Sequence, residues 1–230
     1  MNFGSVLQHL RDTSKHFGAA AALYDAEYRG VNHLVPVQVL RAMALEFDDL
    51  DSKHFDSHRF TGRFCSREDL LQALSDPEIA SQLDADFVHR ARARGDECHG
   101  MFYGDRLVSF IWYSTRPTPC EDDLVVHVDP AWVYMYKAYT VNEFRGRRLN
   151  AIGVNMASHV FSRGGSSGLV CYVEANNYSS LRAQEHMGFH SFGAIYVARA
   201  FGRTLTWATP GCKPYGFYLE WTGDPQRALA

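Results

Sequence analysis

The spacing of apolar residues changes along the chain from a helical period to that of β-strands. Residues 3–27 carry apolar positions at roughly helical intervals, which predicts one amphipathic helix. Two further helices are predicted where Ser66 and the pair Asp76-Pro77 precede acidic residues, because such residues cap and charge a helix start. Residues 36–46 fit a strand or a helix, since a short apolar run is typical of both.

From residue 98 the pattern favours strands, interrupted by two helices. Gly104-Asp105 between β-rich runs predicts a hairpin, and a Pro-rich loop is expected over 116–123. This order of elements predicts an α/β (α+β) protein, in which helices cover a mixed sheet. The remaining strands are predicted over 124–128, 132–141, 168–175, 194–201 and 215–221, and the two helices over 149–162 and 180–187, each ended by glycine.

Length and composition narrow the class of protein. A chain of 230 residues suits one domain with an elaboration or two small domains, and 46% hydrophobic residues allow an ordinary core. The formal charge of −3 gives no global attraction for nucleic acid or an anionic membrane. The first residues lack a signal-peptide pattern, and no apolar run reaches the ~18 residues of a membrane span. Five dispersed cysteines and eleven dispersed histidines suggest neither disulfides nor a metal site, so we expect a cytoplasmic, metal-free protein.

The segment KAYTVNEFRGRRLNAIG carries the strongest chemical signal. A strand ends near Val141, a turn with Arg145-Gly146-Arg147-Arg148 follows, and a helix starts near Leu149. Backbone N–H groups at a helix start, the helix dipole and nearby guanidinium groups together favour a phosphate or diphosphate. A Walker loop is excluded because no Gly-Lys-Ser/Thr follows, and a single glycine excludes the Rossmann fingerprint. The alternative interpretation is a solvated basic helix start.

This segment resembles the phosphate-binding motif of the GNAT superfamily of acyl-CoA-dependent N-acyltransferases, Gln/Arg-x-x-Gly-x-Gly/Ala. Arg145 matches the first position, whereas Arg148 and Asn150 stand where the family has small residues. A later family motif, Asn-x-x-Ser-Ile/Leu-x-x-Tyr-x-x-x-Gly-Phe, is matched with the same spacing, and Gln184 replaces its tyrosine. The residues that match the later motif are Asn177, Ser180, Leu181, Gly188 and Phe189. Either Ser179 or Ser180 is expected to cap the second helix.

The resemblance covers about residues 98–220 and implies a GNAT-like, largely antiparallel central sheet flanked by helices. It implies a domain over residues 59–230, preceded by an N-terminal helical extension over residues 1–58. The co-substrate implied is acetyl-CoA or another acyl-CoA, which in the family lies in a V-shaped gap between the fourth and fifth strands. The residues implied to bind it are Ala138, Tyr139, Thr140, Val141, Arg145, Gly146, Arg147, Arg148, Leu149, Asn150, Asn177, Ser180 and Gln184.

The implied reaction is direct attack of a primary amine on the thioester, which requires a base and a proton for the leaving thiolate. Glu174, at the end of the fifth strand of the family's fold, is the first candidate for the base, and His127 is a weaker one. Gln184 cannot supply the proton, so Tyr178, Ser180, Tyr139 or water would have to replace the family's tyrosine. Glu174, Tyr178 and Ser180 are therefore the expected catalytic residues.

Three functions stay open at this stage, and the amine acceptor is unidentified in each. The first is transfer of an acetyl group from coenzyme A to a primary amine. The second is a non-catalytic acyl-CoA sensor, suggested by Gln184 and the altered small positions. The third uses a longer acyl donor such as acyl carrier protein, which a basic turn would suit. The N-terminal extension is expected to cover the acceptor site or to form a homodimer contact.

Overall fold

The computed structural model describes residues 3–34, 36–49, 59–121 and 123–223. The helices are α1 Phe3–Phe17, α2 Ala19–Leu34, α3 Arg67–Ala73, α4 Pro77–Ala80, α5 Ala85–Arg94, α6 Leu149–Arg163 and α7 Tyr178–His186, with short 3-10 helices η1 Phe47–Asp49, η2 Asn142–Phe144 and η3 Pro210–Tyr215. The strands are β1 Val37–Glu46, β2 Thr61–Phe64, β3 Glu97–Tyr103, β4 Arg106–Ser114, β5 Thr118–Glu121, β6 Leu124–His127, β7 Trp132–Thr140, β8 Gly168–Glu174, β9 His190–Ala200, β10 Arg203–Ala208 and β11 Tyr218–Trp221.

Eight strands form the central sheet in the order β10-β9-β1-β8-β7-β4-β3-β2. Every neighbouring pair is antiparallel except β7 and β8, which are parallel and are connected through α6. The predicted mixed, largely antiparallel sheet flanked by helices is therefore confirmed. A second sheet of three strands, in the order β11-β6-β5, packs against the first.

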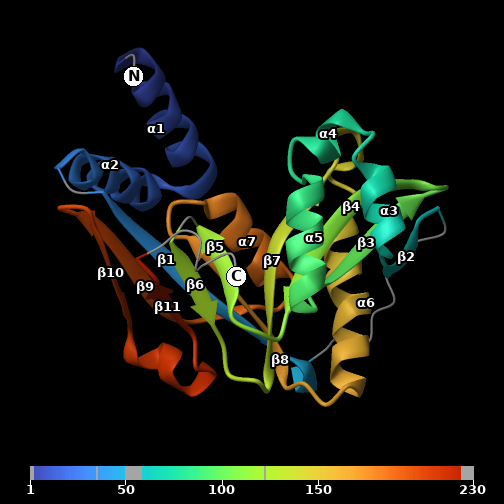
Figure 1. The fold of residues 1–230 in the computed structure, drawn as a ribbon. Helices are drawn as coiled ribbons and strands as arrows, with labels where there is room; N and C mark the ends of the chain where they lie inside the picture. The colour runs from blue at the N-terminus through green and yellow to red at the C-terminus, as the bar shows by residue number, and fades with distance from the viewer. Residues whose placement is uncertain (1–2, 35, 50–58, 122, 224–230) are drawn as a thin grey trace.

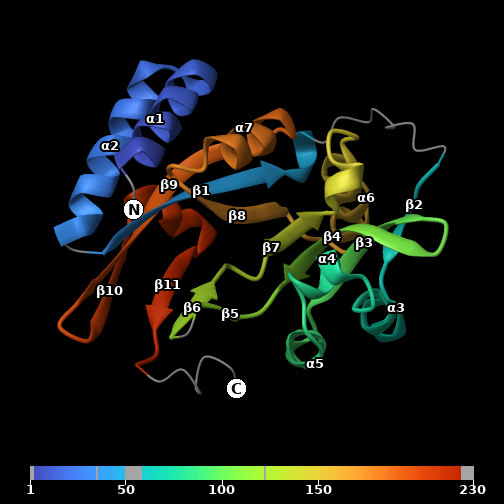
Figure 2. The same cartoon turned by 90° about the horizontal axis from the view of Figure 1, so that it is seen from above.

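Helices and the second sheet cover the two faces of the central sheet (Figures 1 and 2). Helices α6 and α7 lie on one face, where Val154 and Leu181 pack with Ile111 and Leu169 of the strands. The opposite face is covered in two parts. Helices α3 to α5 pack on its β2–β4 half, and the three-stranded sheet packs on the half formed by β8, β1 and β9.

Local capping signals start α3 and α4 as the sequence predicts, but the second predicted helix is split into α4 and α5, and Asp84 caps α5. Ser66 accepts a hydrogen bond from the backbone N–H of Asp69, which completes a capping box at the start of α3. Asp76 caps α4, whose first residue is Pro77. Gly104 has a φ of 58° in the turn of the predicted β3–β4 hairpin.

The N-terminal segment differs from its expected form. The single helix expected over 3–27 is instead two helices, α1 and α2, separated at Gly18, whose φ is 92°. Residues 37–46, which fit a strand or a helix, form strand β1 between β8 and β9, so the extension is helical only through Leu34 and then joins the sheet. The expected domain boundary at residue 58 lies outside the described residues. None of the helices in the described ranges combines the length and apolar character needed to cross a bilayer.

Candidate functional site

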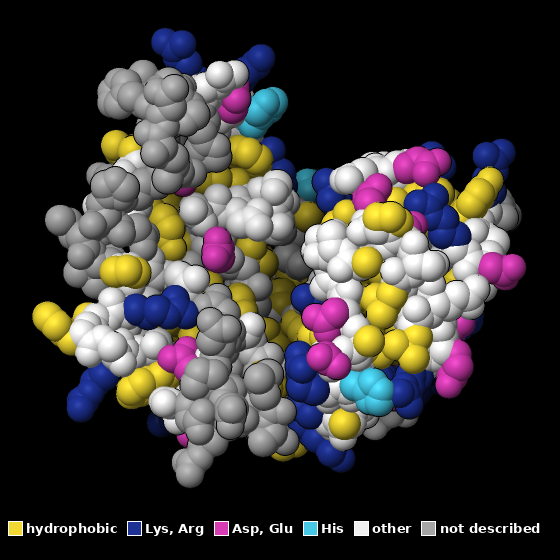
Figure 3. Space-filling view, turned by 45° about the horizontal axis from the view of Figure 1, so that its top comes forward, with side chains coloured by type: hydrophobic (Ala, Val, Ile, Leu, Met, Phe, Trp, Pro, Cys, Tyr) yellow, Lys and Arg dark blue, Asp and Glu magenta, His cyan; other side chains and the backbone are white. Residues whose placement is uncertain are grey.

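Strands β7 and β8 begin side by side and then separate. Their parallel pairing joins Trp132–Tyr134 to Gly168–Val170 and extends no further. Beyond it β7 continues beside β4, and β8 continues beside β1, so the two strands diverge as they rise in the view of Figure 1. The unpaired edges of β7 and β8 that face each other border a V-shaped gap, which we call the splay. Figure 3 shows the molecular surface hollowed between the half of the molecule that contains β7 and the half that contains β8. Unpaired strand edges offer N–H and C=O groups to an extended ligand.

A β-bulge in β7 lies at the point where the splay opens. Tyr136 pairs with Trp112 and Tyr139 with Phe110, so Lys137 and Ala138 together stand opposite the single residue Ile111. A bulge of this kind bends its strand and redirects side chains. Lys137 has a φ of 46°, in the left-handed region that non-glycine residues seldom occupy. Such strain is found where the surrounding fold enforces it, often at functional sites.

The turn between β7 and α6 presents uncapped backbone N–H groups. Gly146 and Arg148 have positive φ values of 77° and 58°, and α6 begins at Leu149 without a side-chain cap. Within the described residues, no hydrogen bond reaches the backbone N–H groups of residues 146–151. Nothing lies within 4 Å of a Cβ placed on Gly146, so the turn is open at this position. Uncapped N–H groups at an open helix start are the features on which the predicted anion site depends.

The three arginines of the turn are exposed but differ in their contacts. Arg145 folds back on β7, where its guanidinium donates to the carbonyl of Thr140 at 3.2 Å and stacks over the Tyr139 ring. Arg147 lies over the Phe144 ring at 5.3 Å. The Arg148 side chain makes no hydrogen bond, ion pair or ring contact with the described residues, so its guanidinium is available to a ligand.

Two further residues predicted to bind the co-substrate turn inward. Leu149 is 2% exposed and packs in the core, so only its backbone can face a ligand at the turn. The Oδ1 atom of Asn150 is buried without a hydrogen-bond partner among the described residues. Asn150 therefore replaces the family's small residue by directing its side chain inward, away from the open turn.

Helix α7 follows the second motif with one correction. Its cap is Asn177, whose Oδ1 accepts from the backbone N–H of Ser180 at 3.2 Å, so the expectation that Ser179 or Ser180 caps the helix is wrong. An asparagine side chain reaches the same orphan N–H groups as serine does. Gly188, with a φ of 94°, and the buried Phe189 end the motif as predicted.

The hydroxyl candidates for the proton donor have different surroundings. Tyr178 donates its hydroxyl hydrogen to the carbonyl of Ala21 in α2 at 2.8 Å, and its ring packs on Phe17. Burial raises the pKa of Tyr178. Its hydroxyl therefore joins α7 to the N-terminal helices. Ser180 is half-buried, and its hydroxyl makes no hydrogen bond with the described residues. Gln184 is 8% exposed with an unpartnered Oε1 atom.

The two candidates for the base lie on different sheets. Glu174 is the exposed last residue of β8, and strand alternation places it on the same face as Val170 and Tyr172. That face is the one covered by α3–α5 and the second sheet, so Glu174 borders the splay on the side opposite α6. His127 lies on β6, where its Nε2 is 2.7 Å from Glu220 Oε2 and its ring stacks on Tyr218. His127 thus takes part in a surface pair on the second sheet.

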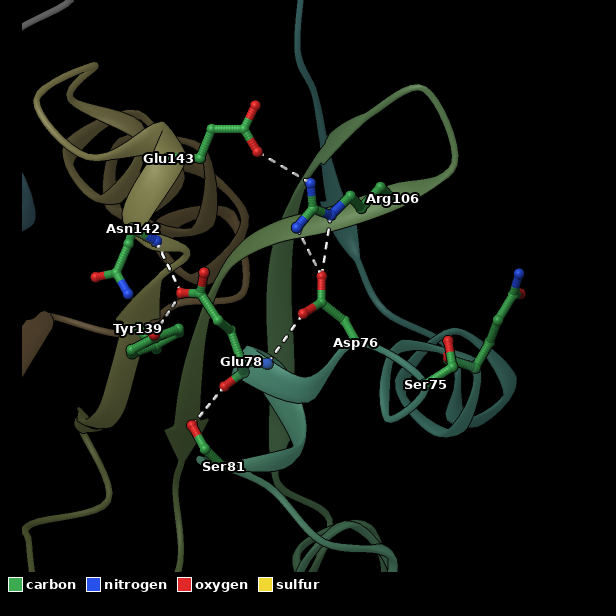
Figure 4. A network of polar contacts seen from close by, with 9 residues as sticks. Ser75, Asp76, Glu78, Ser81, Arg106, Tyr139, Asn142 and Glu143 are labelled. Carbon is green, nitrogen blue, oxygen red and sulfur yellow. Dashed lines mark hydrogen bonds and ion pairs between the residues drawn. The ribbon is translucent and has the colours of Figure 1, made fainter.

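Helix α4 contacts the end of β7 through Glu78, a residue that sequence reasoning missed (Figure 4). Its Oε2 accepts from the Tyr139 hydroxyl and from the backbone N–H of Asn142, each at 3.0 Å. Burial raises the pKa of Tyr139, and the hydrogen bond to Glu78 raises it further. Tyr139 therefore has a structural partner for its hydroxyl. The only local signal at Glu78 was its place in a predicted helix start, because both partners lie more than sixty residues later.

A second missed contact supports the bulge from the α5 side. Asp96 is 1% exposed and accepts from the Tyr136 hydroxyl at 2.5 Å, the Ser114 hydroxyl at 2.7 Å and the Arg94 guanidinium at 2.7 Å. Burial and Asp96 both raise the pKa of Tyr136 well above its ordinary value. The Tyr136 ring stacks on Tyr134, which is buried in the core.

Comparison with known proteins identifies the fold. No protein-family model and no curated protein sequence matches the chain. A GCN5-related N-acetyltransferase from Sphaerobacter thermophilus matches with a TM-score of 0.50 and 13% identity over 78% of this chain and 55% of that one. A Drosophila protein matches with a TM-score of 0.50 and 15% identity over 73% of this chain and 54% of that one.

A third solved structure is a GCN5-related glucosamine N-acetyltransferase region of a fungal multi-domain GH3 β-N-acetylglucosaminidase. It matches with a TM-score of 0.50 and 10% identity over 76% of this chain and 22% of that one. The chain thus spans about half the length of the first two structures and about a fifth of the third. Together with the splay, the bulge and the uncapped turn, these likenesses show that the chain has the GNAT-superfamily fold.

Proposed function

We propose that the chain is an N-acyltransferase that moves an acyl group, most simply acetyl, from coenzyme A to a primary amine. The observation that carries this proposal is the combination of the splay with the uncapped turn at its outer end. The turn offers unpaired N–H groups and the guanidinium groups of Arg147 and Arg148 to a diphosphate. The edge of β7 beyond Tyr134 is not paired with β8, so its backbone groups are offered to the amide-containing arm of the same molecule, apart from the Thr140 carbonyl, which accepts from Arg145.

The proposed acyl transfer has three chemical requirements. The acceptor amine must be neutral when its nitrogen attacks the thioester carbonyl carbon, the developing oxyanion must be stabilised, and the thiolate must gain a proton. Glu174 is the proposed proton acceptor, because it is exposed and borders the splay. Ser180 is the best placed of the three hydroxyl candidates, because the Tyr178 hydroxyl donates to Ala21 and the Tyr139 hydroxyl donates to Glu78.

A specific observation also supports a non-catalytic acyl-CoA sensor. Gln184 stands where the resembling family has its proton donor, and Tyr178 is engaged by α2. Turnover separates the two functions: release of free thiol from acetyl-CoA in the presence of an amine panel supports the enzyme. Tight coenzyme binding with no thiol release against any amine, for short or long acyl donors, supports the sensor.

The coenzyme site itself is tested at Gly146 by calorimetric titration with coenzyme A. Gly146→Ala adds backbone strain at a φ of 77°, costing roughly 1 kcal/mol of stability, but meets no atom within 4 Å. Gly146→Asp adds the same strain together with a negative charge beside the proposed diphosphate. We expect Gly146→Asp to bind coenzyme A at least ~10-fold more weakly than Gly146→Ala. Equal affinities for the two variants would contradict a diphosphate site at this turn.

A further inference from the structure

The amine of Lys137 lies on the side of the sheet that faces α5, where the splay opens. Lys137 is three residues beyond Tyr134, the last β7 residue paired with β8. Its side chain is exposed, and its Nζ is 4.8 Å from the centre of the Phe87 ring on α5. The bulge and the positive φ fix the direction in which this side chain leaves the strand. The fold therefore holds a primary amine beside the gap proposed to admit a thioester.

The surroundings of Lys137 favour a nucleophilic amine. Desolvation lowers the pKa of Lys137, which increases the neutral fraction, whereas the charge of Asp84 opposes this shift. The face of the Phe87 ring, 4.8 Å from Nζ, offers no hydrogen-bond acceptor, but it attracts the ammonium form and so opposes the shift as Asp84 does. Only the neutral form of a lysine attacks a carbonyl carbon.

We propose that Lys137 is itself an acyl acceptor, so that the chain acylates its own bulge residue; this proposal rests on the proposed function. The ε-nitrogen attacks the thioester carbonyl carbon of acyl-CoA, a C–N bond forms and the C–S bond breaks. The coenzyme leaves as thiolate and takes up the proton that the nitrogen loses. The product is a neutral amide, so the α5 side of the splay loses one positive charge where the acceptor would enter.

The sequence makes this reaction simple to follow, because the chain holds only four lysines: Lys15, Lys53, Lys137 and Lys213. Lys15 on α1 and Lys213 in η3 serve as internal controls, because neither lies on the two strands that border the splay. The full chain is incubated with acetyl-CoA, and the occupancy of each lysine is followed by peptide mass spectrometry. We expect Lys137 to be acetylated at least ~10-fold faster than either control. Intact mass should show one added acetyl group in the wild type and none in Lys137→Arg at the same time point.

Two further experiments distinguish a failure of this inference from a failure of the proposed function. Gly146→Asp should slow labelling of Lys137 and leave the two control lysines unchanged. A small acetyl thioester without a nucleotide should label Lys137 over Lys213 with much lower selectivity than acetyl-CoA does. If coenzyme A binds and amines are acylated while Lys137 is labelled no faster than Lys213, the inference is overturned and the proposed function stands. If coenzyme A does not bind at all, both are overturned.

Discussion

Glu78→Gln should loosen the junction between α4 and the end of β7. One carboxylate oxygen of Glu78 accepts two hydrogen bonds, from the Tyr139 hydroxyl and from the Asn142 backbone, each at 3.0 Å. A hydrogen bond to a charged group contributes ~1.5–3 kcal/mol to stability and a neutral one ~0.5–1.5 kcal/mol. Glutamine keeps the shape of the Glu78 side chain but removes its charge. The two hydrogen bonds would together contribute roughly 2 kcal/mol less to stability if the site were fully buried. Because Glu78 is half-buried, we expect a loss of about 1 kcal/mol.

The assay is urea denaturation followed by far-UV circular dichroism, with coenzyme A titration of the same samples. Asn142 begins the turn that leads to the proposed phosphate site, so weaker coenzyme binding should accompany the loss of stability. Tyr139→Phe removes one charged hydrogen bond entirely, whereas Glu78→Gln weakens two, so the two variants should cost similar amounts, about 1 kcal/mol each. The double variant should cost less than the sum of the single variants, since the two residues share a bond.

The matched control is Glu143→Gln in the same network (Figure 4). The Glu143 carboxylate is 3.3 Å from the Arg106 guanidinium, but its side chain is 66% exposed, so its loss should be within experimental error. Our reasoning would be refuted if Glu78→Gln cost no more than Glu143→Gln. It would also be refuted if the effects of Glu78→Gln and Tyr139→Phe were strictly additive.

Three other substitutions test separate parts of the site and core. Asp96→Asn leaves the Arg94 guanidinium without its buried counter-charge and should cost ~3 kcal/mol in urea denaturation, whereas a loss below ~1 kcal/mol would contradict a structural role. Burial lowers the pKa of His99 to about 4 from 6.5, so the unfolded chain alone takes up this proton as the pH falls. Stability should thus fall by about 3 kcal/mol between pH 6.5 and 4, and His99→Leu should flatten this slope; equal slopes would be inconsistent with the buried imidazole. Glu174→Gln should lower turnover ~10²-fold at unchanged coenzyme affinity, with exposed Glu185→Gln as control, and wild-type turnover would remove Glu174 from the mechanism.

Signals that act within a few residues were sufficient to predict several elements. Ser66 and Asp76 start helices because their side chains reach N–H groups two or three residues away. Gly188 ends α7 because glycine adopts a positive φ without strain. The same logic placed Asn177 correctly in the second motif and yet assigned the cap to a neighbouring serine. Several polar side chains compete for the same N–H groups there, and only their geometry decides between them.

Short strands in the second sheet and at the edge of the first were the elements that local patterns missed. The loop expected over 116–123 contains β5, and β10 was not predicted at all. The strand expected over 215–221 is reduced to β11, with η3 before it. Strands β5 and β10 form hairpins with their sequence neighbours β6 and β9, whereas β11 pairs with the distant β6, so each of these segments is ordered by its partner strand. Hydrogen bonds of this kind depend on the whole fold, since short segments have no strong preference of their own.

The sequence by itself determined the strand–turn–helix at Gly146, the glycine-ended helix α7 and the fold class, because capping, turn chemistry and hydrophobic period are local properties of a chain. Tertiary structure alone decided that β1 enters the sheet between β8 and β9, that β7 leaves β8 after Tyr134, and that Glu78 and Asp96 meet tyrosines of β7. These features join residues separated by dozens of positions. Their free energy comes from burial and pairing that exist only once the chain is compact.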